Sequence, residues 1–331
     1  MPISLPLRPS LAPYVIAIAS FFATAAGAQD FPIVIDHAFG STTITEKPTR
    51  VATVAWANHE VPLALGIVPV GMARANFGDD DGDGVLPWVA DRLDELKAEV
   101  PVLFDEGDGI DFEAVAATAP QVILAAYSGL SRADYDTLSK IAPVVPYETA
   151  PWSTSWRDMI RLNAAGLGMV AEGDALIDNI EGEIAQKVAA YPEIAGKTAM
   201  FIIHLDVRDL SVIRFYSEND TRVQFLSDIG LASPRAVQEA SQPGQFAGEI
   251  SAERIDTFDD VDIIVTYGGQ PLLDRVKSNL LTAHLPSVRN GAVVLLGNNR
   301  VGTSVNPTPL SITAVLDEYL QLLSTAAQAV E

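Results

Sequence analysis

The segment NFGDDDGDGVLPW, residues 76–88, concentrates side chains that could bind a cation. It holds four aspartates and three glycines within nine residues. Counted as an EF-hand calcium loop from Asp79, it has aspartates at positions 1, 3 and 5 and a glycine at position 6. Position 12 is Ala90, where the motif requires a bidentate glutamate, and no helix pattern precedes the loop. The sequence therefore predicts a solvated acidic turn, with Trp88 just beyond it as the residue that could face a binding site.

Other metal or catalytic motifs are missing from the sequence. The four histidines, His37, His59, His204 and His284, are scattered without close pairing, which disfavours a direct Mn or Zn binder. The chain has no G-x-S-x-G elbow, no H-E-x-x-H and no P-loop, so a hydrolase site would have to be assembled from unmarked residues. A binding protein is favoured over an exported hydrolase, and no resident cofactor or protein-bound metal is expected.

Charge and length restrict the partners and the architecture. The 331 residues have a formal net charge of -22, which argues against nucleic acid or an anionic membrane surface as the main partner. An anionic small ligand would have to be met by local arginines. The length exceeds what one hydrophobic core usually organises, so two domains or two lobes are expected.

The first 28 residues have the features of a cleaved signal peptide. One charge, Arg8, precedes an apolar run from Tyr14 that closes on Ala26-Gly27-Ala28, so cleavage is expected near Gln29. The alternative is a membrane anchor, but the run is short and rich in Ala and Ser. Because the chain has no cysteine, it has no lipid attachment site at the cleavage point. The sequence predicts a soluble periplasmic protein rather than a lipoprotein.

The apolar periodicity predicts two α/β lobes joined by one long helix. Residues 33–45 read as a hairpin around Gly40, and from Arg50 short strands alternate with helices, as in parallel βα units. Residues 153–190 form one continuous helical pattern, after which the βα rhythm resumes. The expected boundaries are 1–28 for the signal peptide, 29–150 for the first lobe, 151–190 for the bridging helix and 191–331 for the second lobe.

An internal repeat indicates that the two lobes are built alike. DFEAVAATAPQVILAAYSG, residues 111–129, aligns with SAERIDTFDDVDIIVTYGG, residues 251–269. Each copy begins with a helix N-cap residue followed two positions later by glutamate, Glu113 or Glu253. Each then runs through a short helix into a buried strand that ends in a tyrosine and a glycine-containing turn. The repeat therefore favours two lobes of similar construction over two unrelated domains.

Tyr127 and Tyr267 end the equivalent strands of this repeat. Loops at the carboxyl ends of strands form the ligand crevice of an open α/β sheet, so both tyrosines are expected at a shared cleft. Taken singly, each could simply pack at a strand end with its hydroxyl in water. The glutamates of the repeat also have a simple explanation, because a carboxylate in the first turn of a helix is stabilised by the helix dipole.

The order of these motifs resembles the periplasmic substrate-binding proteins of ABC importers for ferric siderophores, the group that includes ferric hydroxamate and vitamin B12 binding proteins. The resemblance runs through RVATVAWANHEVPLALGIVPVGM (50–72), GIDFEAVAATAPQVILAAYSGLSRADYDTLSKIAPVV (109–145), SWRDMIRLNAAGLG, EISAERIDTFDDVDIIVTY, LPSVRNGAVVLL and NPTPLSITAVLDEYL. It implies a monomer of two lobes bridged by a long helix. It also implies that Glu113 and Glu253 dock on arginines of the two permease subunits in the inner membrane.

The resemblance further implies a ferric siderophore as the ligand, with its iron held by the siderophore's own oxygens. Aromatic walls and arginine donors would suit such a ligand. The candidates at predicted strand ends are Trp56, Arg74, Trp88 and Tyr127 in the first lobe and Arg214, Tyr216, Arg222, Phe246, Tyr267 and Arg300 in the second. About half of them are expected to belong to the binding site, since a ligand pocket uses few polar groups. A haem or corrinoid ligand stays open, with His59 and Tyr127 as the candidate axial ligands.

Overall fold

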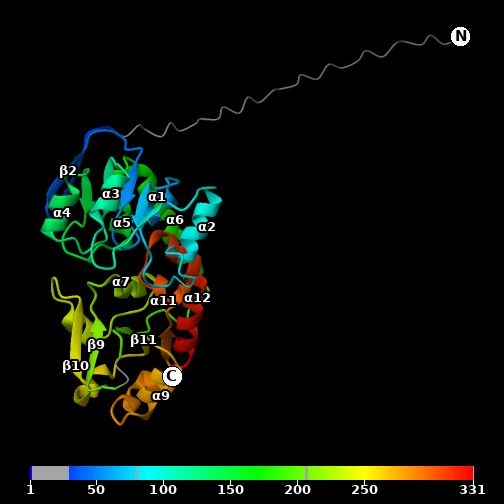
Figure 1. Cartoon of the computed structure of the whole chain (residues 1–331). Helices are drawn as coiled ribbons and strands as arrows, with labels where there is room; N and C mark the ends of the chain where they lie inside the picture. Colours follow the sequence, from blue (N-terminus) through cyan, green and yellow to red (C-terminus); the bar gives the residue numbers. More distant parts are fainter. Residues whose placement is uncertain (2–29, 80, 206–207, 331) are drawn as a thin grey trace.

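The computed structural model describes Met1 and residues 30–79, 81–205 and 208–330. The predicted signal peptide, residues 1–28, falls outside the described residues apart from Met1. Two α/β lobes are stacked on one another, the first drawn from blue to green and the second from green to orange (Figure 1). In the described ranges no helix combines the length and the apolar character that a membrane span requires.

The chain enters the first lobe through the predicted hairpin. β1 (Ile33–His37) pairs antiparallel with β2 (Gly40–Ile44), and Gly40 takes a φ of 129° at the turn. Alternate residues face inward, so Ile35 and Ile44 are buried in one core cluster with Leu124 of the main sheet. The hairpin prediction is confirmed.

The first lobe is a five-stranded parallel sheet in the order β5-β4-β3-β6-β7. Its strands are β3 (Val51–Thr53), β4 (Gly71–Ala73), β5 (Val102–Phe104), β6 (Val122–Ala125) and β7 (Val144–Pro146). Its helices are α1 (Glu60–Ala64), α2 (Pro87–Glu95), α3 (Phe112–Ala117) and α4 (Arg132–Leu138). All strands except the edge strand β5 are fully buried, as expected for a parallel sheet with both faces covered. Their carboxyl ends meet at one edge of the sheet.

The second lobe is a five-stranded mixed sheet in the order β10-β9-β8-β11-β12. Its strands are β8 (Ala199–Ile202), β9 (Val212–Tyr216), β10 (Ala247–Ser251), β11 (Ile263–Tyr267) and β12 (Val293–Leu296). Its helical elements are α7 (Thr221–Asp228), α8 (Arg235–Ala240), η1 (Ala252–Phe258), α9 (Gln270–Ser278), η2 (Thr282–His284), α10 (Pro286–Asn290) and α11 (Arg300–Ser304). β8, β11 and β12 are parallel, and β9 runs antiparallel to both of its neighbours.

The repeat places equivalent strands at equivalent positions. β6 and β11 are each fourth in the order of their sheet, next to the strand that opens the lobe. Asp111 caps α3 by accepting from Ala114 N at 2.9 Å, and Ser251 caps η1 by accepting from Glu253 N at 3.3 Å. The prediction of two similarly built lobes is confirmed, although the second helix is a 3₁₀ helix rather than an α-helix.

The single bridging helix predicted for residues 153–190 is wrong. The segment forms two helices, α5 (Trp156–Gly166) and α6 (Val170–Val188). Gly168 adopts a left-handed φ of 67°, and Met169 N donates to Ala164 O at 2.9 Å, the bond of a Schellman helix end. A side chain at Gly168 would collide with the ring of Phe31. The apolar spacing continues across the break, which is why the periodicity alone did not reveal it.

Two helices, α6 and the C-terminal α12 (Pro309–Gln328), make the junction between the lobes. α6 packs on α5, which covers the first sheet, and on α12. α12 packs on α1 and α2 of the first lobe and on β11 and β12 of the second. In Figure 1 the red α12 descends from the lobe boundary along one side of the second lobe.

Candidate ligand-binding cleft

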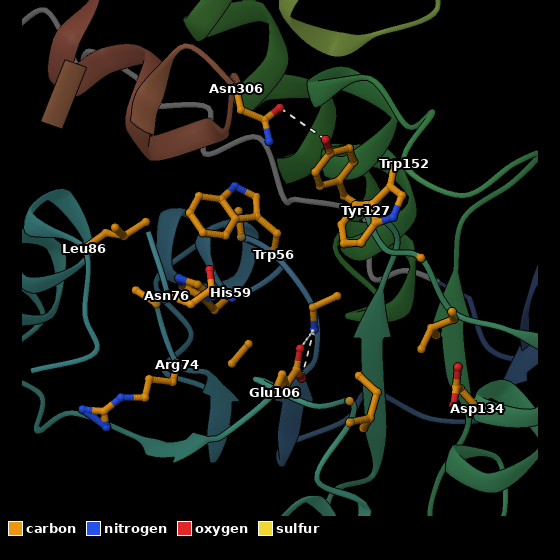
Figure 2. A pocket seen from close by; sticks show the side chains of 18 residues that line it. Trp56, His59, Arg74, Asn76, Leu86, Glu106, Tyr127, Asp134, Trp152 and Asn306 are labelled. Carbon is orange, nitrogen blue, oxygen red and sulfur yellow. Dashed lines mark hydrogen bonds between the residues drawn. The ribbon is translucent and has the colours of Figure 1, made fainter. Parts of the chain in front are cut away.

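A cavity of about 530 Å³ opens at the carboxyl-terminal edge of the first sheet, where it faces the second lobe. The loops after all five strands of that sheet contribute to its wall, as expected for the crevice of an open α/β sheet. Its charged and polar lining residues are His59, Arg74, Asn76, Glu106, Tyr127, Asp134 and Asn306, and its other large lining residues are Trp56, Leu86, Ile110, Leu130 and Trp152. Figure 2 shows these side chains around the cavity.

Three aromatic rings, those of Trp56, Tyr127 and Trp152, contribute to the apolar part of the wall. Trp152 is 44% exposed, and its ring packs edge-on against Tyr127 with the ring centres 5.2 Å apart. The Tyr127 hydroxyl donates to Asn306 Oδ1 at 3.3 Å, and Thr221 of the second lobe donates to the same oxygen at 2.7 Å. The cavity therefore has a stacking surface next to a polar contact between the lobes (Figure 2).

The loop between β3 and α1 is held in a specific conformation that presents Trp56. Ala55 and Ala57 on either side of it both adopt left-handed φ values, 60° and 61°, which are costly for alanine. The buried Asn58 fixes this loop to the segment just after β6, because its side chain donates to Tyr127 O at 2.9 Å and accepts from Tyr127 N at 3.0 Å. These bonds place Trp56 and Tyr127 in one rigid unit.

Two titratable side chains of the wall have strongly shifted pKa values. Burial lowers the pKa of His59 to about 4, so its imidazole is neutral near pH 7, and its Nδ1 has no hydrogen-bond partner among the described residues. Burial raises the pKa of Glu106 to about 7, although its carboxylate accepts from Ala55 N at 2.9 and 3.1 Å. The two groups give the wall one neutral ring and one acid that is half ionised at neutral pH.

On the second-lobe side, Arg222 is the centre of a cluster of tyrosines. Its guanidinium lies 4.1 Å from the ring centre of Tyr216 and donates to Asp220 at 3.0 Å. Burial is the largest single effect on the pKa of Arg222 and lowers it, but the charge of Asp220 and the neighbouring tyrosines together outweigh burial and raise the pKa. Burial also raises the pKa of Tyr267 to about 12 against the opposing charge of Arg222, so this phenol stays protonated. Arg222 and the tyrosines Tyr127, Tyr216 and Tyr267 thus offer hydrogen-bond donors.

Tyr267 also faces a second hollow, of about 590 Å³, in the second lobe. His204 stacks on its ring at 4.9 Å between ring centres, and Phe77 of the first lobe meets it edge-on at 6.2 Å. Next to Phe77, Gly78 N donates to Asn298 Oδ1 at 3.0 Å. The start of the acidic loop, which belongs to the first lobe, therefore contacts the second lobe.

The acidic loop uses its carboxylates to accept backbone N–H groups. Asp79 accepts from Gly82 N at 2.9 Å and from Gly84 N at 2.8 Å, and these bonds outweigh its slight burial and lower its pKa. Carboxylate oxygens of Asp79, Asp81 and Asp83 lie within 4.8 Å of one another. Asp81 and Asp83 are exposed, in agreement with the predicted solvated turn, and neither belongs to the cavity wall.

Three of the ten predicted ligand-binding residues line the cavity, and four others lie in or next to the arginine–tyrosine cluster of the second lobe. Trp56, Arg74 and Tyr127 line the cavity in the first lobe, and Tyr216, Arg222 and Tyr267 form the cluster in the second. The half-buried Phe246 precedes β10, whose first residue, Ala247, pairs with Tyr216. The guanidinium of Arg74 turns toward the acidic loop and donates to Gly82 O and Asp83 O at 3.3 and 3.0 Å.

The other three predicted residues lie elsewhere. Trp88 is only 3% exposed, because the first turn of α2 directs it into the core, where it donates to Glu60 Oε1 at 2.7 Å. Arg300 donates to Ala314 O at 2.7 Å and borders a groove that Trp88 shares, outside the main cavity. Arg214 lies on the solvent face of β9 and pairs with Glu249 of β10. The prediction that these three reach the cleft is wrong in this structure.

Trp152 and Glu106 line the cavity but are not among the residues predicted from sequence. Trp152 follows β7 and Glu106 follows β5, so both lie after strand ends, as Trp56, Arg74 and Tyr127 do. Asn306, between α11 and α12, reaches the cavity from a helix connection that strand patterns do not reveal.

Glu113 and Glu253 are exposed in the first turns of α3 and η1. Neither takes part in an ion pair within the part of the chain that the structure describes. Their carboxylates are therefore accessible at matching positions of the two lobes.

Two lobes with a cleft at the strand ends agree with the match to known families. Residues 51–299 match the family described as periplasmic binding protein. The chain belongs to the periplasmic binding protein family. Among solved structures it is similar to PiaA of Streptococcus pneumoniae TIGR4 in complex with ferrichrome, with 44% identity and a TM-score of 0.86 over 90% of this chain and 100% of that chain. A further structure of PiaA gives 43% identity and a TM-score of 0.82 over the same shares of the two chains.

Curated relatives of this periplasmic binding protein are more distant in sequence. The ferric-anguibactin-binding protein FatB of Vibrio anguillarum is 25% identical over 313 residues, which cover 88% of this chain and 87% of FatB. The probable siderophore-binding lipoprotein YfiY of Bacillus subtilis is 24% identical over 254 residues, which cover 74% of this chain and 71% of YfiY. Both alignments span most of each protein.

Proposed function

We propose that this protein captures a ferric siderophore of the hydroxamate class between its lobes and delivers it to an ABC importer for iron uptake. The observation that carries the proposal is the aromatic cavity at the strand ends of the first lobe, with Arg222 and Tyr216 of the second lobe close to Tyr127 in its wall. The likeness to PiaA, whose solved complex contains ferrichrome, supports the same ligand class.

The polar groups of the cleft suit a ligand rich in oxygen acceptors. Arg222, with its fixed charge, and the protonated phenol of Tyr267 can both donate hydrogen bonds to a ligand. Hydroxamate oxygens around an iron ion carry partial negative charge and accept from such donors. The rings of Trp56 and Trp152 supply apolar area for the organic frame of the chelate.

Iron would be the cargo, held by the oxygens of the siderophore. Within the described residues, the side chains grouped closely enough to hold an ion are Asp79, Asp81 and Asp83, which are not part of the cavity wall. A direct metal binder is therefore disfavoured. A haem or corrinoid ligand is the second candidate, because the neutral His59 borders the same cavity with an unpaired ring nitrogen. The proposed role is binding and release, without a catalytic step.

Delivery would use the two exposed glutamates. Glu113 and Glu253 would each meet one permease subunit, and carboxylate–arginine pairs suit a transient contact because they favour orientation and rapid association. We further propose a monomer that acts in the periplasm after export. The organisation suggested for the domains is a first lobe, residues 29–150, a helical connection, residues 151–190, and a second lobe, residues 191–331.

Intrinsic tryptophan fluorescence tests the proposal directly, because Trp56 and Trp152 line the cavity. The purified protein is titrated with a ferric hydroxamate, a ferric catecholate, ferric citrate, cobalamin and haemin. Quenching at submicromolar concentration by the hydroxamate is expected. Saturable binding of haemin or cobalamin without any response to the ferric chelates would replace the proposal with the second candidate.

A further inference from the structure

Glu106 is a carboxylate in the cavity wall that no cation among the described residues neutralises. It follows β5, and its two oxygens accept one backbone N–H, that of Ala55, which leaves acceptor capacity toward the cavity. None of the ion pairs in the described ranges includes it. A partly buried acceptor of this kind gains most from a charged donor on a ligand.

The other charged or titratable groups of the cavity wall do not supply that donor. The guanidinium of Arg74 is engaged by carbonyls of the acidic loop and extends away from Glu106 (Figure 2). His59 is neutral near pH 7, and burial raises the pKa of Tyr127, which keeps its phenol protonated. Asp134 is a second acid, and one of its carboxylate oxygens accepts from the backbone N–H and the hydroxyl of Ser131 in a capping box.

Across the lobe boundary, the arginine close to Tyr127 of this wall is also already paired. Arg222 is near enough to Tyr127 to affect its titration, and it donates to the buried Asp220. Asn306, which the second half of the chain contributes to the cavity, carries no charge. The first-lobe wall around Glu106 is thus an acceptor surface, whereas the opposite side is a donor surface.

We propose that Glu106 is a specificity residue that selects ferric hydroxamates carrying a protonated amine. This inference rests on the proposed function, and it adds that the iron end of the chelate faces Arg222 while a cationic arm reaches Glu106. The same carboxylate disfavours trianionic ferric catecholates, because a like charge would face them in a partly desolvated wall.

Binding of a cationic arm must be coupled to the ionisation of Glu106. With a pKa near 7 in the free protein, the carboxyl is roughly one tenth ionised at pH 6 and roughly nine tenths ionised at pH 8. An ammonium beside it favours the ionised form, so affinity for an amine-bearing chelate rises with pH across this window. A chelate without a charge on that arm has no such dependence.

A matched pair of probes tests this inference. Ferrioxamine B is a linear ferric trihydroxamate that ends in a primary ammonium, and its N-acetylated form keeps the iron centre but loses the charge. Titrations of tryptophan fluorescence at pH 6, 7 and 8 give both dissociation constants. We expect the ammonium form to bind about tenfold more tightly at pH 8 than at pH 6, and the acetylated form to show no such rise.

Two variants assign the effect to Glu106. Glu106→Gln keeps an oxygen to accept from Ala55 N but removes the charge, and it should abolish both the preference for ammonium and its pH dependence. Asp108→Asn removes a charge from an exposed residue of the same loop and should leave both unchanged. Equal affinity for the two chelates, or a preference that survives Glu106→Gln, overturns the inference while the proposed function stands. If neither chelate nor any other ferric hydroxamate binds, the proposed function itself fails.

Discussion

Glu60 of the first lobe accepts a hydrogen bond from the backbone N–H of Leu310, in the first turn of α12, at 2.9 Å. The same carboxylate accepts from Ser311 N at 3.3 Å and, through its other oxygen, from Trp88 Nε1 at 2.7 Å. A fully buried carboxylate at a helix N-terminus satisfies N–H groups that have no partner within the helix. One side chain of the first lobe thus anchors the C-terminal helix that packs along the second.

Glu60→Ala is expected to destabilise the protein by about 3 kcal/mol, because it leaves buried donors of Trp88 and α12 without acceptors. Urea unfolding monitored by circular dichroism measures the change. Glu99→Ala, at an exposed glutamate beyond α2, is the matched control and should stay within about 0.5 kcal/mol of the parent protein. Similar midpoints for the two variants would show that the Glu60 contacts do not stabilise the fold.

Stability should depend on pH through Glu106. The pKa of Glu106 is about 7 in the folded state, whereas the ordinary value is 4.5. Between pH 4.5 and 7 the folded state therefore keeps a proton that the unfolded state has released. This contribution is fully present below about pH 4.5 and is lost as pH rises through 7, up to about 3 kcal/mol in all. Glu106→Gln should therefore gain stability relative to the parent as pH rises from 5 to 8. A constant difference in unfolding free energy over this range would contradict the shifted pKa.

Substitutions of Trp152, in the cavity wall, and Trp88, in the core, test whether the ligand binds in the main cavity. Trp152→Ala removes a partly exposed ring from the wall and should weaken chelate binding about tenfold with little loss of stability. Trp88→Phe, in the core, should lower the thermal midpoint and leave affinity unchanged within about twofold. The reverse pattern, with Trp88 controlling affinity, would place the ligand in the groove beside α2 rather than in the main cavity.

Substitutions of Arg222 and Arg214 compare the effect of a buried arginine near the cavity with that of an exposed arginine on the surface. Arg222→Gln should weaken binding of a ferric hydroxamate about 100-fold, because it removes a buried charged donor and leaves Asp220 unpaired. Arg214→Gln breaks an exposed ion pair with Glu249, and such pairs contribute little, so affinity should be unchanged. Calorimetric titration measures both variants, with thermal unfolding to check that Arg222→Gln remains folded. Full affinity in a folded Arg222→Gln protein would remove Arg222 from the site.

The docking role of the two glutamates is separable from binding. Glu113→Ala combined with Glu253→Ala should abolish chelate uptake into proteoliposomes that contain the cognate permease, while the dissociation constant for the chelate stays the same. Glu99→Ala combined with Glu239→Ala removes one exposed carboxylate from each lobe elsewhere and should transport normally. A loss of chelate affinity in the first double variant would mean that these glutamates are structural.

The architecture could be predicted because its determinants are local in sequence. The hairpin around Gly40, the alternation of βα units and the repeat ending at Tyr127 and Tyr267 all follow from spacing and N-cap chemistry. The break between α5 and α6 could not be predicted from apolar periodicity, since Gly168 ends one helix without disturbing the spacing. It is a matter of backbone conformation at one residue.

The site could be predicted less completely. Strand ends identify which edge of a sheet a residue occupies, but they do not show which way its side chain points. Trp88 turns into the core to meet Glu60, and Arg214 takes the outer face of β9 because side chains alternate along a strand. Trp152 follows the same strand-end rule as Trp56, so it could have been found from sequence by applying that rule to β7.

Because α12 is attached to both lobes, it limits how far one lobe can rotate against the other. Its first turn is bonded to Glu60 of the first lobe, and its body packs on β11 and β12 of the second. Any rotation of one lobe against the other must bend this 20-residue helix or detach it from Glu60. An α-helix bends gently along its length, so small rotations deform it elastically and the deformation energy favours return to the resting angle. We therefore expect the bending stiffness of α12 to restrict the lobes to small rotations and to return them to their resting angle.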